Sequence, residues 1–416
     1  MTTRPCWVEI RTRALEANFR FLAGLASPHA ELLAIVKANA YGHSLALCAP
    51  AVVRAGAKWL GVTSVEEGIV ARALCPDARV LIIGGVFPGQ AAAAIQFQLT
   101  PVAWEPWQLD ELLAAARAAG AQAGSFSIHL EIDTGMSRQG AGLNDLAGLL
   151  ARFGPGSPLR LEGVMTHLFA ADEADGQATL EQLPRLDESM SRISAAGLFA
   201  EWLNVGASAT LLAGQAATVA DLAARHGMKA MLRPGLALYG LVPRFDPAFT
   251  APADPRFAPS FLAGPPSPAE PASLAAARAA LQPVLTWKAS VAGVPSVAVG
   301  ATVGYNATFV ATEPMRLALV SAGYGDGLTR SLGNRFSLLV RGQRAPLVGR
   351  VSMDQIVLDV TEIPGVEPGD EVVILGAQGS ESGNDTITAF DHADAAGTIP
   401  WEVFTRIAPR VPRISV

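Results

Sequence analysis

A chain of 416 residues exceeds the usual size of one hydrophobic core, so we expect two domains. Half of the residues are hydrophobic and only 16% are charged, which is typical of a well-buried globular protein. The net charge of −6 gives no reason to expect binding to nucleic acid or to an anionic membrane, and no apolar run reaches the length of a membrane span.

The N-terminal segment 1–7 lacks the apolar stretch of a signal peptide, so we expect no secretion signal. The three cysteines, Cys6, Cys48 and Cys75, cannot all pair within the chain and have no metal-ligand spacing. A reducing cytoplasm is the simplest location for such a protein, with the thiols inert and no metal bound.

Residues 5–10 are predicted to form a short strand, and an amphipathic helix follows. Short apolar runs then alternate with alanine-rich helical stretches, which is typical of parallel strands connected by helices. The eight runs lie at 32–36, 59–63, 80–84, 99–103, 126–132, 159–165, 202–205 and 231–238. This count favours a (β/α)₈ TIM-type barrel over residues 11–243. A doubly wound open sheet is the alternative, but no Gly-x-Gly-x-x-Gly follows the first strand.

The segment 244–283 is rich in Pro, Ala, Ser and Gly and predicts a linker or surface excursion. Within it, residues 273–281 are expected to form a short helix with Ser273 as its N-cap. Beyond residue 283 the apolar runs are short, β-branched and separated by Gly-rich turns, which predicts a mostly-β domain. This C-terminal domain, residues 284–416, is expected to take up the N-terminal strand, residues 1–10.

The residue that organises the candidate site is Lys37, at the end of the first apolar run. An ammonium at the mouth of a buried strand is partly desolvated, which lowers its pKa and makes it a usable nucleophile. Such lysines form Schiff bases with carbonyl compounds, including pyridoxal phosphate (PLP). The alternative interpretation is a lysine that only leaves the sheet for solvent.

In a (β/α)₈ barrel the carboxyl ends of the strands converge on one mouth. Small residues after the seventh and eighth strands are expected to expose backbone N–H groups near helix starts, which is an anion-binding arrangement. A phosphate cradle opposite an imine-forming lysine suits PLP. The polar or small residues at these strand ends are Lys37, Tyr41, Glu131, Asp133, Arg138, Thr166, His167, Asn204, Gly206, Ser208, Arg233 and Gly235.

The chain resembles the alanine racemases. The resemblance extends from residue 4 to residue 414, apart from the 244–283 excursion, and it rests on several motifs that occur in the family's order. These are the segments 36–43, 132–138, 165–167, 232–240, 303–307, 323–327 and 348–355.

The resemblance implies that Lys37 carries PLP and acts as one base, while Tyr305 reaches the partner subunit's active site as the second base of a shared-site homodimer. Arg233 would face the pyridine nitrogen, which makes the cofactor a weaker electron sink because arginine keeps its proton. The other implied contacts are Tyr41, Ser208, Gly235, Leu236 and Trp401 at the phosphate, His167 at the ring, and Arg138, Met353 and Tyr324 at the substrate.

Two positions differ from the family pattern. Glu131 stands where many relatives have a carbamylated lysine, and we expect its permanent charge to orient Arg138 without dissolved CO₂. Trp401 stands where relatives usually have tyrosine, so the sequence does not decide the phosphate contact or the width of the pocket. Ser352, in place of the usual cysteine, is a milder change.

The resemblance implies a PLP-dependent racemase that interconverts L- and D-alanine and supplies D-alanine for peptidoglycan. A serine or broad-specificity racemase is an alternative, because pocket width at Trp401 and Ser352 cannot be read from the sequence. A decarboxylase on the same barrel would lack the 37–43 and 323–327 motifs. A non-catalytic PLP carrier would have no use for Tyr305.

Overall fold

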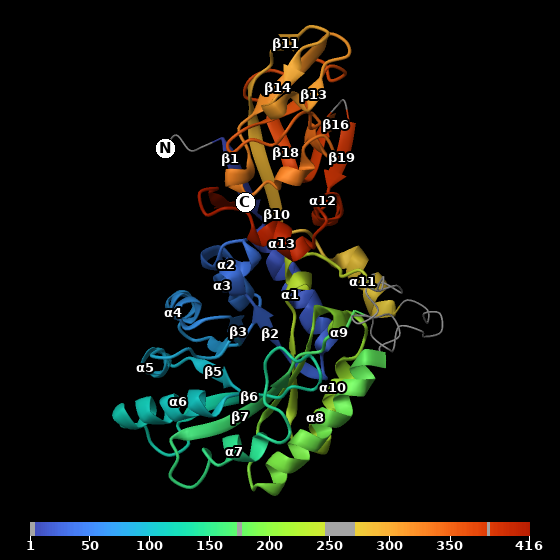
Figure 1. The fold of residues 1–416 in the computed structure, drawn as a ribbon. Helices are drawn as coiled ribbons and strands as arrows, with labels where there is room; N and C mark the ends of the chain where they lie inside the picture. Colours follow the sequence, from blue (N-terminus) through green and yellow to red (C-terminus); the bar gives the residue numbers. More distant parts are fainter. Residues whose placement is uncertain (1–4, 173–176, 246–270, 381–382) are drawn as a thin grey trace. The chain divides into compact units, whose positions relative to one another are not determined.

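A computed structural model describes residues 5–172, 177–245, 271–380 and 383–416 of the chain. The chain divides into two compact units (Figure 1). The barrel unit comprises Ala14–Lys37 and Ala49–Gln282, and the β unit comprises Met1–Arg13, Ala38–Cys48 and Pro283–Val416. Most of the expected 244–283 excursion, residues 246–270, lies outside the described residues.

The barrel unit contains a closed parallel barrel, as the alternating apolar runs predict. Its last strand pairs with its first, with Leu32 opposite Leu232, so the sheet has no edge. Nearly all strand residues are buried, which explains why the strands read as continuous apolar runs. The strands are β2 (Ala30–Ile35), β3 (Trp59–Val62), β4 (Arg79–Ile82), β5 (Thr100–Ala103), β6 (Phe126–Glu131), β7 (Leu159–Thr166), β8 (Trp202–Ala207) and β9 (Lys229–Arg233).

Helices lie between the strands, and local sequence signals set where several of them begin. Ser64 caps α4 by accepting a hydrogen bond from the Glu67 amide at 3.3 Å. Pro106 stands at the first position of α6, where its missing N–H costs nothing. The helices are α1 (Thr12–Ala26), α3 (Leu45–Arg54), α4 (Val65–Leu74), α5 (Ala91–Gln96), α6 (Pro106–Ala118), α7 (Leu146–Leu150), α8 (Gln177–Ala195), α9 (Ser208–Leu212), α10 (Ala216–Arg225) and α11 (Ala272–Ala280), with the 3₁₀ helix η1 (Leu236–Tyr239).

The expected helix at 273–281 is present as α11, but Ser273 is not its N-cap. Pro271 occupies the cap position, and the Ser273 hydroxyl donates to the Leu212 carbonyl at 2.7 Å. The tertiary contact therefore uses the hydroxyl that the sequence assigned to the cap. Within the described residues, no helix is long and apolar enough to cross a membrane.

The β unit is built on an antiparallel sheet that takes up the N-terminal strand, as predicted. Strand β1 pairs with β10, with Cys6 opposite Ala289 and Ile10 opposite Leu285, and also pairs in parallel with β20. The strands are β1 (Cys6–Ile10), β10 (Leu285–Gly293), β11 (Ser296–Val297), β12 (Thr302–Val303), β13 (Phe309–Val310), β14 (Met315–Val320), β15 (Ser337–Val340), β16 (Gln343–Pro346), β17 (Ile356–Asp359), β18 (Glu371–Ser380), β19 (Gly383–Ile387) and β20 (Arg413–Ser415).

Short helical segments connect these strands and carry several of the predicted site residues. A capping box at Thr388 starts α12, where the Asp391 amide donates to the Thr388 hydroxyl at 3.1 Å. The segments are η3 (Tyr305–Ala307), η4 (Tyr324–Asp326), η5 (Arg330–Leu332), α12 (Ala389–Ala396) and α13 (Pro400–Thr405). One further short segment, α2 (Lys37–Tyr41), directly follows β2 of the barrel.

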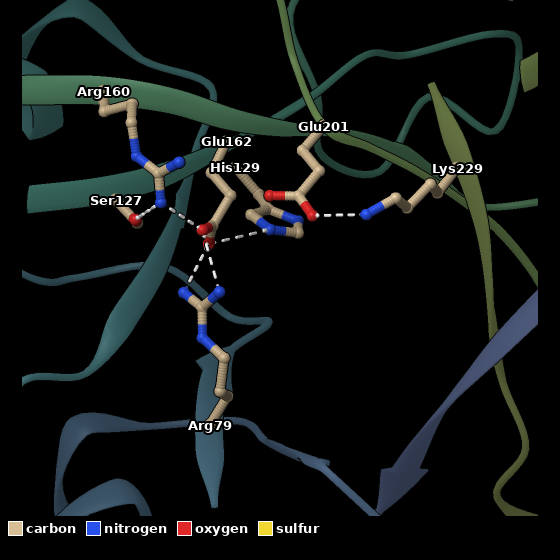
Figure 2. A network of polar contacts seen from close by, with 7 residues as sticks. All are labelled: Arg79, Ser127, His129, Arg160, Glu162, Glu201 and Lys229. Atoms are coloured by element: carbon tan, nitrogen blue, oxygen red, sulfur yellow. Dashed lines mark hydrogen bonds and ion pairs between the residues drawn. The ribbon is translucent and has the colours of Figure 1, made fainter. Parts of the chain in front are cut away.

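A buried carboxylate, Glu162 of β7, lies near the amino ends of the barrel strands (Figure 2). Arg79, the first residue of β4, donates to both of its oxygens at 2.8 and 2.6 Å, and Arg160 donates at 2.5 Å. Burial raises the pKa of Glu162, but the polar partners His129 and Arg79 offset this effect and bring the pKa down to about 2. Glu162 is therefore ionised in the folded protein at neutral pH.

Replacing Arg79 by Met is expected to lower the free energy of unfolding by about 3 kcal/mol at pH 7, because it leaves a buried charge short of its main partner. Since the folded-state pKa of Glu162 lies below its ordinary 4.5, its stabilisation is complete above pH 4.5 and is lost toward pH 2. The deficit of the variant should therefore shrink as the pH falls. Urea denaturation at several pH values measures it.

The matched control is Arg20→Met, which removes an exposed ion pair to Glu16 at 3.2 Å. An exposed pair is worth less than about 1 kcal/mol, so this variant should stay close to the wild type. Equal losses in the two variants would contradict a stabilising role of the buried network.

Candidate active site

Lys37 follows β2 at the mouth of the barrel. The end of β2 is fixed by the Ile35 amide, which donates to the Pro234 carbonyl at 3.1 Å, and by the Tyr239 hydroxyl, which donates to the Ile35 carbonyl at 3.0 Å. Burial lowers the pKa of the Lys37 amine, and the positive charges of Arg138 and Arg233 lower it further. A larger share of this amine is therefore unprotonated than for a lysine in water.

Arg233, the last residue of β9, is buried and held by the ends of β7 and β8. Its Nη1 donates to the backbone and side-chain oxygens of Asn204, both at 2.7 Å. Its Nη2 donates to the Thr166 carbonyl at 2.8 Å and to His167 Nδ1 at 3.2 Å. Burial lowers the pKa of Arg233 to about 10, so the guanidinium remains charged at neutral pH.

His167 is neutral because its side chain is buried and lies among cations. Burial and the positive charges of Arg233, Arg138 and Lys37 lower its pKa to about 3. Since Nη2 of Arg233 can only donate, His167 Nδ1 must accept, and the ring proton resides on Nε2. His167 is thus a fixed support for Arg233 rather than an acid or base at neutral pH.

The residues after β8 and β9 differ in detail from the expected cradle of free backbone N–H groups. The amides of Gly235 and Ala237 both donate to the Ser208 hydroxyl oxygen at 3.1 Å. Because this oxygen already accepts two hydrogen bonds, the hydroxyl proton of Ser208 is left to donate elsewhere. Leu236 starts the 3₁₀ helix η1 directly after Gly235.

Glu131 ends β6 and is only 2% exposed. Its carboxylate accepts a hydrogen bond from the side-chain amide of Gln139, the residue after Arg138. The predicted role of Glu131 in orienting Arg138 stays a prediction. Burial raises the pKa of Glu131, and the Gln139 hydrogen bond and the charges of Arg233 and Arg138 work against that rise. Sequence reasoning missed Gln139, although it directly follows Arg138.

Directly after Lys37 the backbone makes a left-handed turn, in which four residues have φ between 51° and 56°: Ala38, Asn39, Ala40 and Tyr41. This conformation costs about 1–2 kcal/mol per residue. Hydrogen bonds hold it, among them Gly42 N to Ala38 O at 2.9 Å and Leu45 N to Asn39 Oδ1 at 2.7 Å. The turn fixes the backbone at Tyr41, a predicted phosphate ligand in the β unit.

The other predicted residues of the β unit lie on loops and short helices. Tyr324 and Met353 are neighbours, because the Tyr324 amide donates to Ser352 O at 2.9 Å and the Gly325 amide donates to Met353 O at 2.8 Å. Tyr305 begins η3 and is 67% exposed. Trp401 lies on α13 and is partly exposed.

Within the barrel unit the structure brings together Lys37, Glu131, His167, Ser208, Arg233, Gly235 and Leu236 at the carboxyl ends of the strands, with Arg138 on the loop after β6. The arrangement offers an amine of lowered pKa, a charged guanidinium with a neutral histidine behind it, and a hydroxyl donor. This set suits covalent capture of a carbonyl compound that carries an anionic group.

Comparison with known proteins identifies the family. The profile of the alanine racemase N-terminal domain matches residues 10–243, and that of the C-terminal domain matches residues 284–415. The chain belongs to the alanine racemase family. An alanine racemase of Nostoc sp. is 36% identical over 417 residues, covering 100% of this chain and 96% of the relative.

Solved alanine racemases share the fold. The enzyme from D-cycloserine-producing Streptomyces lavendulae is 34% identical, with a TM-score of 0.80 over 100% of this chain and 98% of that one. An alanine racemase from Bartonella henselae with covalently bound PLP is 24% identical, with a TM-score of 0.78 over 99% of each chain. At that identity, the second likeness concerns the fold alone.

The environment of His167 predicts that its imidazole does not titrate between pH 5 and 8. NMR of the histidine side chains, with the signal assigned through His167→Gln, measures this directly. Replacing Arg233 by Met removes one neighbouring cation and should raise the pKa of His167, although burial keeps it below 6.5. A wild-type midpoint near 6.5 would contradict the neutral support assigned to this ring.

Proposed function

We propose that this chain is a PLP-dependent alanine racemase that interconverts L- and D-alanine. The observation that carries the proposal is the Lys37 amine, whose pKa burial lowers at the mouth of a barrel of the alanine racemase family. When bound, PLP withdraws electrons from the substrate Cα and so makes its proton acidic. The residues of the barrel mouth fit this group through a reactive amine, a hydroxyl donor and a buried cation.

The family resemblance assigns Arg233 to the pyridine nitrogen, and a count of its hydrogen-bond donors indicates which N–H is available for this contact. A guanidinium has five N–H groups, and four of them are used by Asn204, Thr166 and His167. The remaining N–H, on Nε, is the one available to a ring nitrogen. Since arginine keeps its proton, this contact leaves the ring nitrogen unprotonated and the cofactor a moderate electron sink.

The phosphate of the cofactor is assigned to donors that follow strand ends. Ser208 offers its hydroxyl proton, since its oxygen already accepts from the Gly235 and Ala237 amides. Leu236 and Gly235 are the backbone positions implied by the family resemblance, with Tyr41 and Trp401 of the β unit as side-chain donors. Because the Gly235 amide already donates to Ser208, we assign the backbone donation to the Leu236 amide. Trp401 can donate only through its indole nitrogen.

Lys37 and Tyr305 are assigned as the two proton handlers, with Tyr305 supplied by the partner subunit of a homodimer. Racemisation needs one group to remove the Cα proton and another to return a proton from the opposite side. Tyr305 is 67% exposed in the single chain, as expected for a residue that serves another subunit. A phenol has an ordinary pKa of about 10, so it needs nearby positive charge to act as a base.

The substrate carboxylate is assigned to Arg138 and the Met353 amide, with Tyr324 beside it. Arg138 suits this task because its guanidinium forms no hydrogen bond or ion pair among the described residues. A planar guanidinium binds a carboxylate through two parallel hydrogen bonds.

The proposal also includes the domain boundaries 11–243, 244–283 and 1–10 with 284–416, a cytoplasmic location, and D-alanine supply for peptidoglycan.

The test is incubation of the purified enzyme and PLP with L-alanine, L-serine or L-lysine, followed by chiral chromatography of the products. We expect D-alanine to form fastest. Lys37→Ala should abolish racemisation, and Tyr305→Phe should lower kcat at least about 100-fold, since a positioned acid–base group contributes 10²–10⁴. Conversion of L-serine faster than L-alanine would favour the broader racemase, and full activity of Tyr305→Phe would refute the two-base assignment.

A further inference from the structure

Arg138 lies on a closed loop, residues 131–141, at the carboxyl end of β6. The base of the loop is tied by two backbone hydrogen bonds, from Ala141 N to Glu131 O at 2.8 Å and from Asp133 N to Ala141 O at 3.0 Å. Inside the loop, Asp133 Oδ1 accepts from the amides of Gly135 and Ser137 at 2.9 and 3.1 Å. The backbone before Arg138 is thus held by local turns.

One side of the 131–141 loop is also clamped from the next strand and from α8. The hydroxyls of Thr134 and Thr166 are 2.8 Å apart. Gln182 Nε2 donates to the Thr134 hydroxyl at 2.8 Å, and Arg185 Nη1 donates to the Thr134 carbonyl at 3.1 Å. These contacts lie four residues before Arg138, so they do not fix the chain that follows it.

Gln139 supplies the clamp on the other side of Arg138. Its Nε2 donates to the Glu131 carboxylate and to the Ile83 carbonyl, the latter at 3.2 Å. A primary amide has two N–H groups on this nitrogen, so both are used. The anchors are rigid, because Glu131 ends β6 with only 2% exposure and Ile83 directly follows β4.

We propose that Gln139 is a positioning residue that sets Arg138 for the substrate carboxylate, with the buried Glu131 carboxylate and the Ile83 carbonyl as its anchors. Because Gln139 and Arg138 are adjacent, fixing the amide fixes the backbone from which the guanidinium extends. Glu131 therefore acts on Arg138 through Gln139 rather than by direct contact. The proposal rests on the proposed function for the identity of the substrate.

The experiment compares steady-state racemisation of alanine by the PLP-loaded wild type and by Gln139→Leu. Loss of a hydrogen bond to a charged group should raise the KM for alanine about tenfold, with kcat within about threefold. Glu131→Gln keeps an acceptor for the Gln139 amide and should raise KM less than Gln139→Leu does. The matched control is Gln96→Leu, on the exposed end of α5, which should leave both constants unchanged.

A reciprocal exchange separates the hydrogen bond from general damage to the loop. Gln139→Glu places two carboxylates together and should raise KM at least as much as Gln139→Leu. Adding Glu131→Gln to it restores a pair of one amide and one carboxylate but not the hydrogen bond to the Ile83 carbonyl, so KM should fall below that of Gln139→Glu without reaching the wild-type value. An unchanged KM in Gln139→Leu, or a KM in the double variant no lower than in Gln139→Glu, would overturn the proposal.

Binding of propionate, a carboxylate without an amine, distinguishes this proposal from the proposed function. Calorimetry on the PLP-loaded enzyme should give a dissociation constant about tenfold weaker in Gln139→Leu. Arg138→Leu is the reference, and unchanged propionate binding in that variant refutes the substrate-binding role of Arg138. If propionate binding is weaker in Arg138→Leu but unchanged in Gln139→Leu, only the positioning role of Gln139 is refuted.

Discussion

The barrel mouth is subject to an electrostatic constraint, because it gathers three cationic side chains. Lys37, Arg138 and Arg233 share this mouth, and burial together with the two arginines lowers the pKa of the lysine. Arg233 cannot release its proton at neutral pH. The lysine is therefore the group that loses its proton more readily, and the neutral amine is available for covalent chemistry.

Glu131 and Glu162, both buried in the barrel unit, show how the surroundings of a carboxyl group change its pKa. Burial raises the pKa of Glu162, but His129 and Arg79 outweigh this effect and bring the pKa down to about 2. Glu131 has an amide partner, Gln139, and burial raises its pKa. The ionised Glu162 carboxylate is paired with cationic side chains of the barrel, whereas Glu131 has a neutral amide as its hydrogen-bond partner.

The sequence predicted those features that depend on pattern. Continuous apolar runs predicted the barrel strands, because both faces of a parallel sheet are buried. The short strand at 5–10 was correctly paired with the C-terminal sheet. Residues at strand ends formed the candidate list, since the topology of a barrel brings these ends together.

The sequence did not predict features that depend on unusual backbone conformations or on tertiary contacts. No glycine occupies 38–41, so nothing in the sequence indicated a left-handed turn there. The Ser208 hydroxyl takes two amides that the sequence left free for an anion, and Ser273 donates to another helix instead of capping its own. Gln139 belongs to no recognisable sequence pattern, because its contacts are side-chain hydrogen bonds to residues at the ends of β4 and β6.

The most direct test of the account is the titration of Lys37 in the PLP-free chain. The chain has four lysines, so ¹⁵N-lysine labelling with Lys37→Arg for assignment resolves this amine by NMR. The account predicts a midpoint clearly below 10.5 and below that of Lys58, whose pKa is raised by its hydrogen bond to Glu31. A Lys37 midpoint at 10.5 or above would contradict it.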